Sequence, residues 1–97
     1  MAQIKTFKDL KVWKRAHQLA IHIYQITAKF PIDEKYGLNS QIRRAAVSVV
    51  SNIVEGFSRK TIKESLNFYN ISYGSLEELK YQLLLACDLT YITEEDY

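Results

Sequence analysis

The chain has 97 residues, of which 47% are hydrophobic and 25% are charged, and its formal net charge is +2. This length suits one small domain, and this composition is ordinary for a soluble globular protein. Every apolar run is far shorter than the roughly 18 residues of a membrane span, and the first residues, MAQIKTFKDL, lack the apolar core of a signal peptide. We therefore expect a cytoplasmic protein, and the single cysteine, Cys87, agrees with a reducing compartment.

The first predicted helix covers about residues 9–29. Thr6 and Asp9 have the spacing of a capping box, and Pro31 prevents the helix from continuing. Apolar and small side chains recur at spacings of three and four, which is typical of the seam of a bundle helix; they are Trp13, Ala16, Ala20, Ile23, Thr27 and Phe30. A second, mostly basic stripe comprises Lys8, Lys11, Arg15, Gln18, His22, Gln25 and Lys29. We interpret this stripe as a solvated face rather than a ligand site.

The second predicted helix covers about residues 40–57, with Asn39 or Ser40 as its cap. Its polar side chains fall into one narrow stripe, which comprises Gln41, Arg44, Ser48, Ser51, Asn52, Glu55 and Arg59. Apolar residues, with Arg43 as the one intruder, fill an arc about twice the roughly 100° that a surface helix needs. This width predicts that the helix is covered from two sides. Gly56 fits either a residue just past the C-terminus or a position inside a slightly longer helix.

The third predicted helix covers about residues 62–88 and opens with a capping box formed by Thr61 and Glu64. Its seam comprises Ile62, Leu66, Tyr69, Tyr73, Leu76, Leu79, Leu83 and Ala86. Gly74 and the serine after it lie mid-helix, and we interpret them as a place where a neighbouring backbone approaches closely. A fourth helix is predicted to begin at about residue 94, and the sequence reaches only its first turn.

These elements predict an all-α fold, an antiparallel up-down helical bundle that forms a single domain over residues 1–97. The wide apolar arc of the second helix and the incomplete fourth helix both indicate that the three long helices lack a cover. We therefore predict self-association through apolar surface on the first two helices. The candidate interface residues are Val12, Leu19, Val47, Val50, Val54 and Phe57.

No constellation of catalytic or metal-binding residues is visible in the sequence. His17 and His22 are five residues apart and point roughly 140° from each other on a helix, so they cannot share one metal ion. The sequence contains no His-Glu-x-x-His or Glu-x-x-His pattern, no spacing typical of a protease triad and no glycine-rich phosphate loop. Cys87 is interpreted as a small core residue. We therefore expect a non-enzymatic protein without a metal, a cofactor or a small-molecule substrate.

Charge is distributed unevenly along the sequence. Residues 1–63 carry twelve Lys and Arg against four Asp and Glu, whereas residues 64–97 carry one Lys against seven Asp and Glu. Either two oppositely charged surfaces orient neighbouring copies, or a basic face meets nucleic-acid phosphates. The candidate phosphate-binding residues are Lys8, Lys11, Arg15, Lys29, Arg43, Arg44, Arg59, Lys60 and Lys63. The tyrosines Tyr24, Tyr36, Tyr69 and Tyr73 could stack on bases, but we assign them to packing because aromatic residues at helical spacing are usually core.

Several segments together resemble a known family. They are FKDLKVWKRA at 7–16, FP at 30–31, YGLNSQIRRAAVSVVSNIVEGFSR at 36–59 and GSLEELKYQLLLA at 74–86. These segments are similar to the bacterial four-helix-bundle proteins first met as reading frames in intervening sequences of 23S ribosomal RNA. The same family includes the accessory variability protein of diversity-generating retroelements. Where this sequence has Val50 and Val54, the family commonly has Pro and Ala, and both differences enlarge the apolar arc.

The resemblance implies a homo-oligomeric ring, typically a pentamer, with a non-enzymatic role tied to RNA or to an RNA–reverse transcriptase complex. Arg43, Arg44 and Arg59 match basic positions of the family, which leaves open whether they contact RNA or a neighbouring copy. We therefore predict an oligomeric accessory protein that associates with RNA through a basic face and has no membrane partner. The alternative is a structural oligomer or protein–protein adaptor without nucleic-acid binding.

Overall fold

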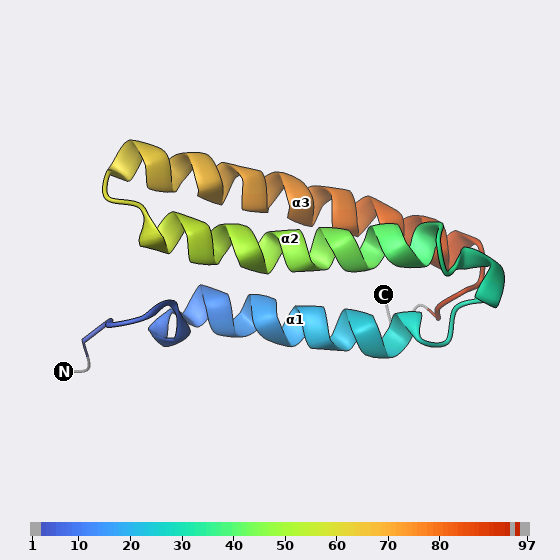
Figure 1. Cartoon of the computed structure of the whole chain (residues 1–97). Coiled ribbons are helices and arrows are strands. Elements are labelled where there is room, and N and C mark those ends of the chain that lie inside the picture. Colours follow the sequence, from blue (N-terminus) through green and yellow to red (C-terminus); the bar gives the residue numbers. More distant parts are fainter. Residues whose placement is uncertain (1–2, 94, 96–97) are drawn as a thin grey trace.

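The computed structural model describes residues 3–93 and residue 95 (Figure 1). In this part the chain forms three α-helices and two short 3₁₀ helices, and it contains no strand. The elements are η1 (Phe7–Asp9), α1 (Lys11–Thr27), η2 (Ile32–Glu34), α2 (Leu38–Ser58) and α3 (Ile62–Asp88). The predicted all-helical fold is confirmed. The fourth helix expected from about residue 94 falls on positions that lie almost entirely outside the described residues.

α1 is shorter than the predicted span of 9–29, because the capping box closes a separate 3₁₀ turn before it. The carboxylate of Asp9 accepts hydrogen bonds from the backbone N–H groups of Lys5 and Thr6 at 2.8 and 3.0 Å. These bonds stabilise the ionised form and lower the pKa of Asp9. Leu10 then adopts an extended conformation, with φ −77° and ψ 128°, so the helix begins only after it.

α2 is longer than predicted, and its N-terminal cap is not the one expected. The capping position is Gly37, which has no side chain to offer, and neither Asn39 nor Ser40 caps the helix. Instead, Oε1 of Glu34 accepts a hydrogen bond from the first helical N–H, that of Leu38, at 3.3 Å. An acidic group at this end is favourable because the helix dipole presents its positive pole there.

Gly56 lies inside α2 and is buried, which confirms the second of the two placements considered for it. The ring of Tyr69, on α3, lies directly against it: a Cβ atom at Gly56 would come within 2.7 Å of Cδ1 of that ring. The glycine therefore provides the close approach between α2 and α3 that the sequence interpretation had assigned to Gly74. That interpretation is wrong for the described structure, since nothing lies within 4 Å of a Cβ placed on Gly74.

The three helices run up and down in an antiparallel sequence, with α2 between the other two (Figure 1). α1 and α3 both pack against α2, and no Cα atom of α1 comes within 8 Å of a Cα atom of α3. The prediction that α2 is covered from two sides is confirmed. Its buried residues are Leu38, Ile42, Ala45, Ala46, Val49, Ile53 and Gly56.

The bounds of α3 agree with the prediction, and Thr61 caps it by accepting from the N–H of Glu64 at 3.2 Å. Its predicted seam is only half correct. The C-terminal half packs as expected, with Leu79 and Ala86 fully buried, whereas the N-terminal half is exposed and comprises Ile62, Leu66, Tyr69 and Tyr73. α2 packs against α3 along its length. No other helix of the described structure packs against the apolar side chains in the first half of the seam. The packing assignment is also wrong for Tyr36, which is 88% exposed.

Candidate nucleic-acid interface

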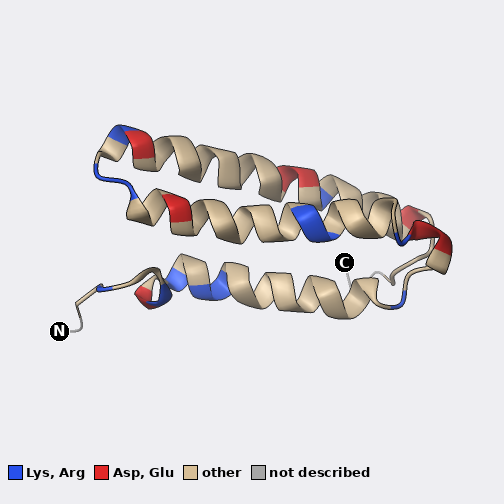
Figure 2. Cartoon of the chain, viewed as in Figure 1, with Lys and Arg blue, Asp and Glu red and all other residues tan. Residues whose placement is uncertain are grey.

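Positive charge gathers at one end of the bundle. The start of α1 and the turn between α2 and α3 lie at this end, on the left in Figure 2. Residues 5–15 and 55–64 together carry eight Lys and Arg against three Asp and Glu. We call the following cations the basic end: Lys5, Lys8, Lys11, Lys14, Arg15, Arg59, Lys60 and Lys63. At the opposite end, residues 29–36 and 85–93 carry two Lys against three Asp and Glu. The uneven distribution of charge along the sequence therefore corresponds to a difference in charge between the two ends of the bundle.

Six of the nine candidate phosphate-binding residues belong to the basic end. Five of them are exposed and have no ion-pair partner among the described residues; they are Lys8, Lys11, Arg15, Lys60 and Lys63. The polar stripe of the first helix is exposed throughout, which agrees with a solvated face. Lys5 and Lys14 also belong to this end, and the sequence interpretation did not include them. The density of lysines in residues 5–15 is the signal that could have found them.

Arg59 is partly engaged within the chain. Its guanidinium forms an ion pair with Glu55, one helical turn earlier, and its Nε donates to the Glu55 carbonyl at 3.3 Å. The guanidinium carbon also lies 4.6 Å from the centre of the Phe68 ring, so the side chain links the end of α2 to the start of α3. The Glu55 carboxylate offsets part of its charge, and the unpaired lysines supply most of the positive field of the basic end.

Arg43 is a structural residue in this chain. Its Nε donates to the Thr27 hydroxyl at 2.8 Å, and its Nη2 donates to the Tyr24 carbonyl at 3.2 Å. The guanidinium also stacks over the Tyr24 ring, 4.4 Å from its centre. Asn39 adds a hydrogen bond to the Thr27 carbonyl at 2.8 Å. Side chains of α2 therefore add hydrogen bonds to carbonyls in the last turn of α1, which also accept from the backbone N–H groups of Ala28 and Phe30.

Arg44 and Lys29 differ from Arg43 in their surroundings. Both are exposed, and neither has a hydrogen-bond or ion-pair partner in the part of the chain that the structure describes. Arg44 lies among polar side chains where α2 meets the connection from η2, and it lines two adjoining recesses there together with Tyr36 and Ser40. Like Arg15 at the basic end, it is free to contact a ligand without giving up an internal hydrogen bond or ion pair.

Within the polar stripe of α2, Ser48 forms a hydrogen bond with α3 and Asn52 bonds to Ser48. The Ser48 and Ser75 hydroxyls are hydrogen-bonded at 2.7 Å, and Asn52 donates to the Ser48 carbonyl at 2.8 Å. Ser72 adds a buried hydrogen bond to the Val49 carbonyl at 2.7 Å. Ser75 was singled out from the sequence together with Gly74, whereas Ser72 was not, because a small polar residue inside a seam carries no periodic signal.

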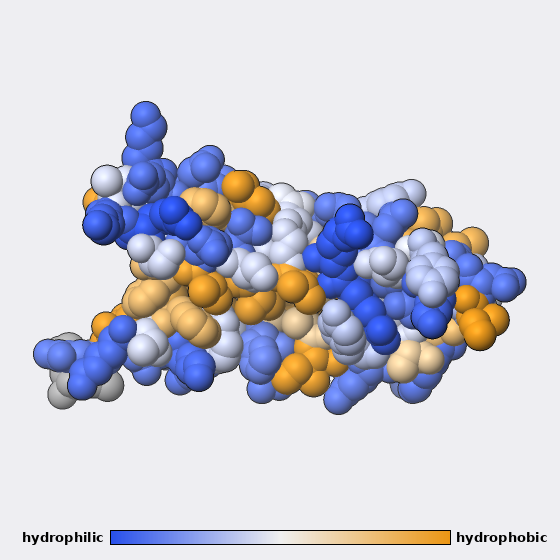
Figure 3. Space-filling view, in the orientation of Figure 1, coloured by the Kyte–Doolittle hydropathy of each residue, from blue (hydrophilic) through white to orange (hydrophobic). Residues whose placement is uncertain are grey.

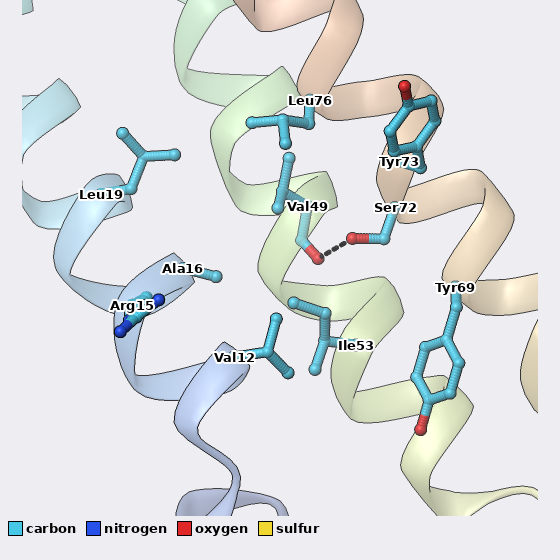
Figure 4. A pocket seen from close by; sticks show the side chains of 10 residues that line it. All are labelled: Val12, Arg15, Ala16, Leu19, Val49, Ile53, Tyr69, Ser72, Tyr73 and Leu76. Atoms are coloured by element: carbon cyan, nitrogen blue, oxygen red, sulfur yellow. Dashed lines mark hydrogen bonds between the residues drawn. The ribbon is translucent and has the colours of Figure 1, made fainter.

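An apolar groove runs between α1 and α3, with α2 as its floor (Figure 4). We call this the α1–α3 groove; its volume is about 430 Å³ and it is lined by Val12, Arg15, Ala16, Leu19, Val49, Ile53, Tyr69, Ser72, Tyr73 and Leu76. Arg15 is the single charged residue among these lining residues. Two of the exposed seam residues of α3, Tyr69 and Tyr73, line this groove.

A second apolar surface follows the seam between α1 and α2 on another face, where Figure 3 shows hydrophobic side chains. We call this the α1–α2 strip; it is lined by His17, Ala20, Ile21, Tyr24, Gln25, Val47, Val50 and Ser51. The six predicted interface residues therefore do not share one surface. Val12 and Leu19 line the groove and Val47 and Val50 line the strip, whereas Val54 and Phe57 are half-buried and continue the face of α2 that carries the strip.

A family model described as 23S rRNA-intervening sequence protein matches residues 8–97. The chain belongs to this family. The match confirms the resemblance seen in the sequence and covers all three α-helices. Comparison with curated proteins gives no match.

Two further observations concern this member of the 23S rRNA-intervening sequence family. Within the described residues, no three His, Cys, Asp or Glu side chains are grouped so that they could hold a metal ion. None of the described helices is long and apolar enough to cross a membrane. Cys87 is half-buried and packs against the core, as predicted for a small core residue.

Proposed function

We propose that this chain is a non-enzymatic, oligomeric helical-bundle protein of the cytoplasm that associates with RNA through its basic end. The convergence of two distant segments on that end is the observation that carries the proposal. Residues 5–15 and 55–64 lie far apart in the sequence, yet the fold places their cations together. The family name supports a link to ribosomal RNA without specifying the contact.

The chemistry of the basic end suits phosphates rather than bases. Most of its free cations are lysines, which act as compact point charges, and Phe7 and Phe68 are already in contact with Trp13 and Arg59. Such a surface binds the RNA backbone without reading its sequence, and its affinity falls steeply with salt because bound counterions are released.

A pair of charge reversals tests this proposal. Lys11→Glu alters the basic end, and Lys80→Glu makes the same change in net charge elsewhere; both lysines are exposed. Binding of a short fluorescein-labelled RNA is measured by fluorescence anisotropy over a series of salt concentrations. The first variant should weaken binding at least about tenfold and lower the salt slope by roughly 1–2, whereas the second should change both much less. Equal effects of the two variants, or no RNA binding by the wild type at low salt, would overturn the proposal.

Self-association is the second part of the proposal. Ile21 and Val47 in the α1–α2 strip are each 42% exposed, and the strip continues along one face of α2, so it offers copies of the chain a common surface. In this view the α1–α3 groove is covered separately, by the fourth helix that the sequence predicts from about residue 94. The family resemblance implies a ring, typically a pentamer.

Light scattering tests the oligomer on the 97-residue chain and on a version extended through the expected fourth helix. A ring-sized mass for both, reduced to a monomer by Val47→Glu, supports the strip as the interface. A monomer for both chains contradicts it. A ring without any RNA affinity would favour the alternative function, a structural oligomer or protein–protein adaptor, which the two apolar surfaces independently support.

A further inference from the structure

Two recesses adjoin at Arg44, near the N-terminus of α2. The first, of about 520 Å³, is lined by Tyr24, Lys35, Tyr36, Asn39, Ser40, Arg43, Arg44 and Val47. The second, of about 510 Å³, is lined by Tyr36, Ser40, Gln41, Arg44, Ala45, Ser48, Ser75 and Glu78. Tyr36, Ser40 and Arg44 line both, so the two recesses adjoin at these residues, and we call them together the Arg44 recess. It lies away from the basic end, and the family match assigns no role to it.

Tyr36 is the most exposed of the large hydrophobic side chains in the described structure, at 88%. Its one aromatic contact is a loose one, with Lys35 Nζ 5.5 Å from the ring centre. Arg44, one of the other residues of the recess, has no internal partner. Contacts within the chain therefore explain the presence of the neighbouring Arg43, but they do not explain the presence of Tyr36 or Arg44.

The groups of the recess are those that bind an unpaired nucleotide. An exposed tyrosine ring offers a face on which a base stacks, and arginine and lysine neutralise the attached phosphate. Ser40 and Gln41 supply hydroxyl and amide groups for the edge of a base. The amide nitrogen of Asn39 is already bonded to Thr27, which leaves its carbonyl oxygen available as an acceptor.

The two carboxylates near the recess do not oppose this assignment. Glu34 accepts hydrogen bonds from the Leu38 N–H and the Tyr91 hydroxyl, so its charge is held against the backbone and the C-terminal segment. Glu78 accepts from Gln82 at 3.1 Å and lines only the second recess. A phosphate therefore fits on the side of Lys35 and Arg43, where no acidic residue lines the surface.

We infer that the Arg44 recess binds a single unpaired RNA nucleotide, with its base stacked on Tyr36 and its phosphate on Arg44 and Lys35. This inference rests on the proposed association with RNA and adds selectivity for single strands to it. The basic end tracks the backbone of any RNA, whereas the recess requires a base that is free of a partner, because the bases of an RNA duplex are stacked and paired. Each surface can therefore fail independently of the other.

The test compares binding of a labelled oligouridine strand with binding of a labelled RNA duplex of the same length by anisotropy. Tyr36→Ala should weaken binding of the single strand about 5- to 50-fold, the range of one lost stacking contact, and leave duplex binding within about twofold. Tyr36→Phe keeps the stacking face and should retain wild-type affinity. Tyr81→Ala removes another tyrosine that is 62% exposed, on α3, and serves as the matched control. Circular dichroism verifies that each variant keeps its helical content.

A second readout locates the contact directly. Photo-crosslinking with 4-thiouridine RNA should label Tyr36 or its immediate neighbours, and Arg44→Gln should reduce the yield. If Tyr36→Ala leaves single-strand binding unchanged, or weakens duplex binding equally, the recess assignment is overturned while the basic end stands. If the wild type binds neither RNA at low salt, the proposed function and this inference both fail.

Discussion

Arg43 and Thr27 join the end of α1 to the N-terminal part of α2 through a hydrogen bond of 2.8 Å from the guanidinium Nε to the hydroxyl oxygen. The Thr27 hydroxyl, which is fully buried, donates in turn to the Ile23 carbonyl at 2.7 Å. A residue that looks like a phosphate ligand in the sequence thus supplies part of the C-terminal cap of another helix. This relationship separates Arg43 from its neighbour Arg44, although the two are adjacent and chemically identical.

Removing each arginine should therefore have different consequences. Arg43→Ala removes the guanidinium hydrogen bonds to the Thr27 hydroxyl and the Tyr24 carbonyl and its stacking on the Tyr24 ring, and should lower the free energy of unfolding by about 1–3 kcal/mol. Arg44→Ala removes an exposed side chain without internal contacts and should change stability by no more than about 0.5 kcal/mol. Urea unfolding followed by circular dichroism measures both. Equal stability of the two variants would show that the cap contributes nothing.

The sequence was most informative where the structure depends on local periodicity. The apolar arc around α2 predicted cover from two sides because burial follows side-chain direction on a helix, and Ile42 and Val49 are indeed buried. Arg43 was visible as an intruder in that arc. Its partner was not, because the turn that brings Thr27 to it is a tertiary feature with no periodic signal.

The candidate site was less predictable than the fold. Exposure of Tyr36 and Tyr73 could not be read from spacing, since an apolar stripe shows which face could be buried and not whether a neighbour exists to bury it. For the same reason the basic residues were found as a list, without their separation into the basic end and the Arg44 recess. That separation depends on which ends of the helices lie together in the fold (Figure 2).

The contact between Gly56 and Tyr69 predicts that Gly56→Ala destabilises the wild type but stabilises a Tyr69→Ala variant. Gly56→Ala alone should destabilise the chain by about 1 kcal/mol or more, because the new methyl group overlaps the Tyr69 ring and forces it to move. In a Tyr69→Ala background the same change should stabilise by about 0.5–1 kcal/mol, since alanine favours helix over glycine. A double-mutant cycle from urea unfolding measures the coupling. Additive effects would mean that the ring does not pack against the glycine in solution.

The hydrogen bond from the Tyr91 hydroxyl to Glu34, 2.9 Å long, predicts a loss of stability at high pH. This bond and the nearby negative charge raise the pKa of Tyr91 above its ordinary value of 10.0. A raised folded-state pKa means that the contribution of the bond is complete below about pH 10 and is lost as the pH rises through the raised value. Urea unfolding at pH 8 and at pH 11 should show a smaller drop for Tyr91→Phe than for the wild type. An identical drop would exclude the contribution of this bond.

The hydrogen bonds of Asp9 predict a loss of stability at low pH, in contrast to the loss at high pH expected from Tyr91. The backbone N–H groups of Thr6 and Lys5 lower its pKa from the ordinary value of 3.8. The contribution of the capping box is therefore complete above about pH 4 and is lost as the pH falls through the lowered value. Titration of the Asp9 carboxyl by NMR should give a midpoint below 3.8, and Thr6→Pro, which removes one of the two N–H donors, should move it upward. A midpoint at or above 3.8 in the wild type would contradict the capping-box geometry.

Val12 reports whether the α1–α3 groove is open or covered. In the described chain Val12 is 57% exposed, so Val12→Asp should alter the stability of residues 1–97 by no more than about 0.5 kcal/mol. In a chain extended through a fourth helix, the same carboxylate would be buried among apolar groups and should destabilise by about 2 kcal/mol or more. Val12→Ala serves as the control for lost methyl groups alone. Comparing unfolding of both variants in both chains therefore tests whether the added helix occupies the groove. Equal effects of Val12→Asp in the two chains would contradict that placement.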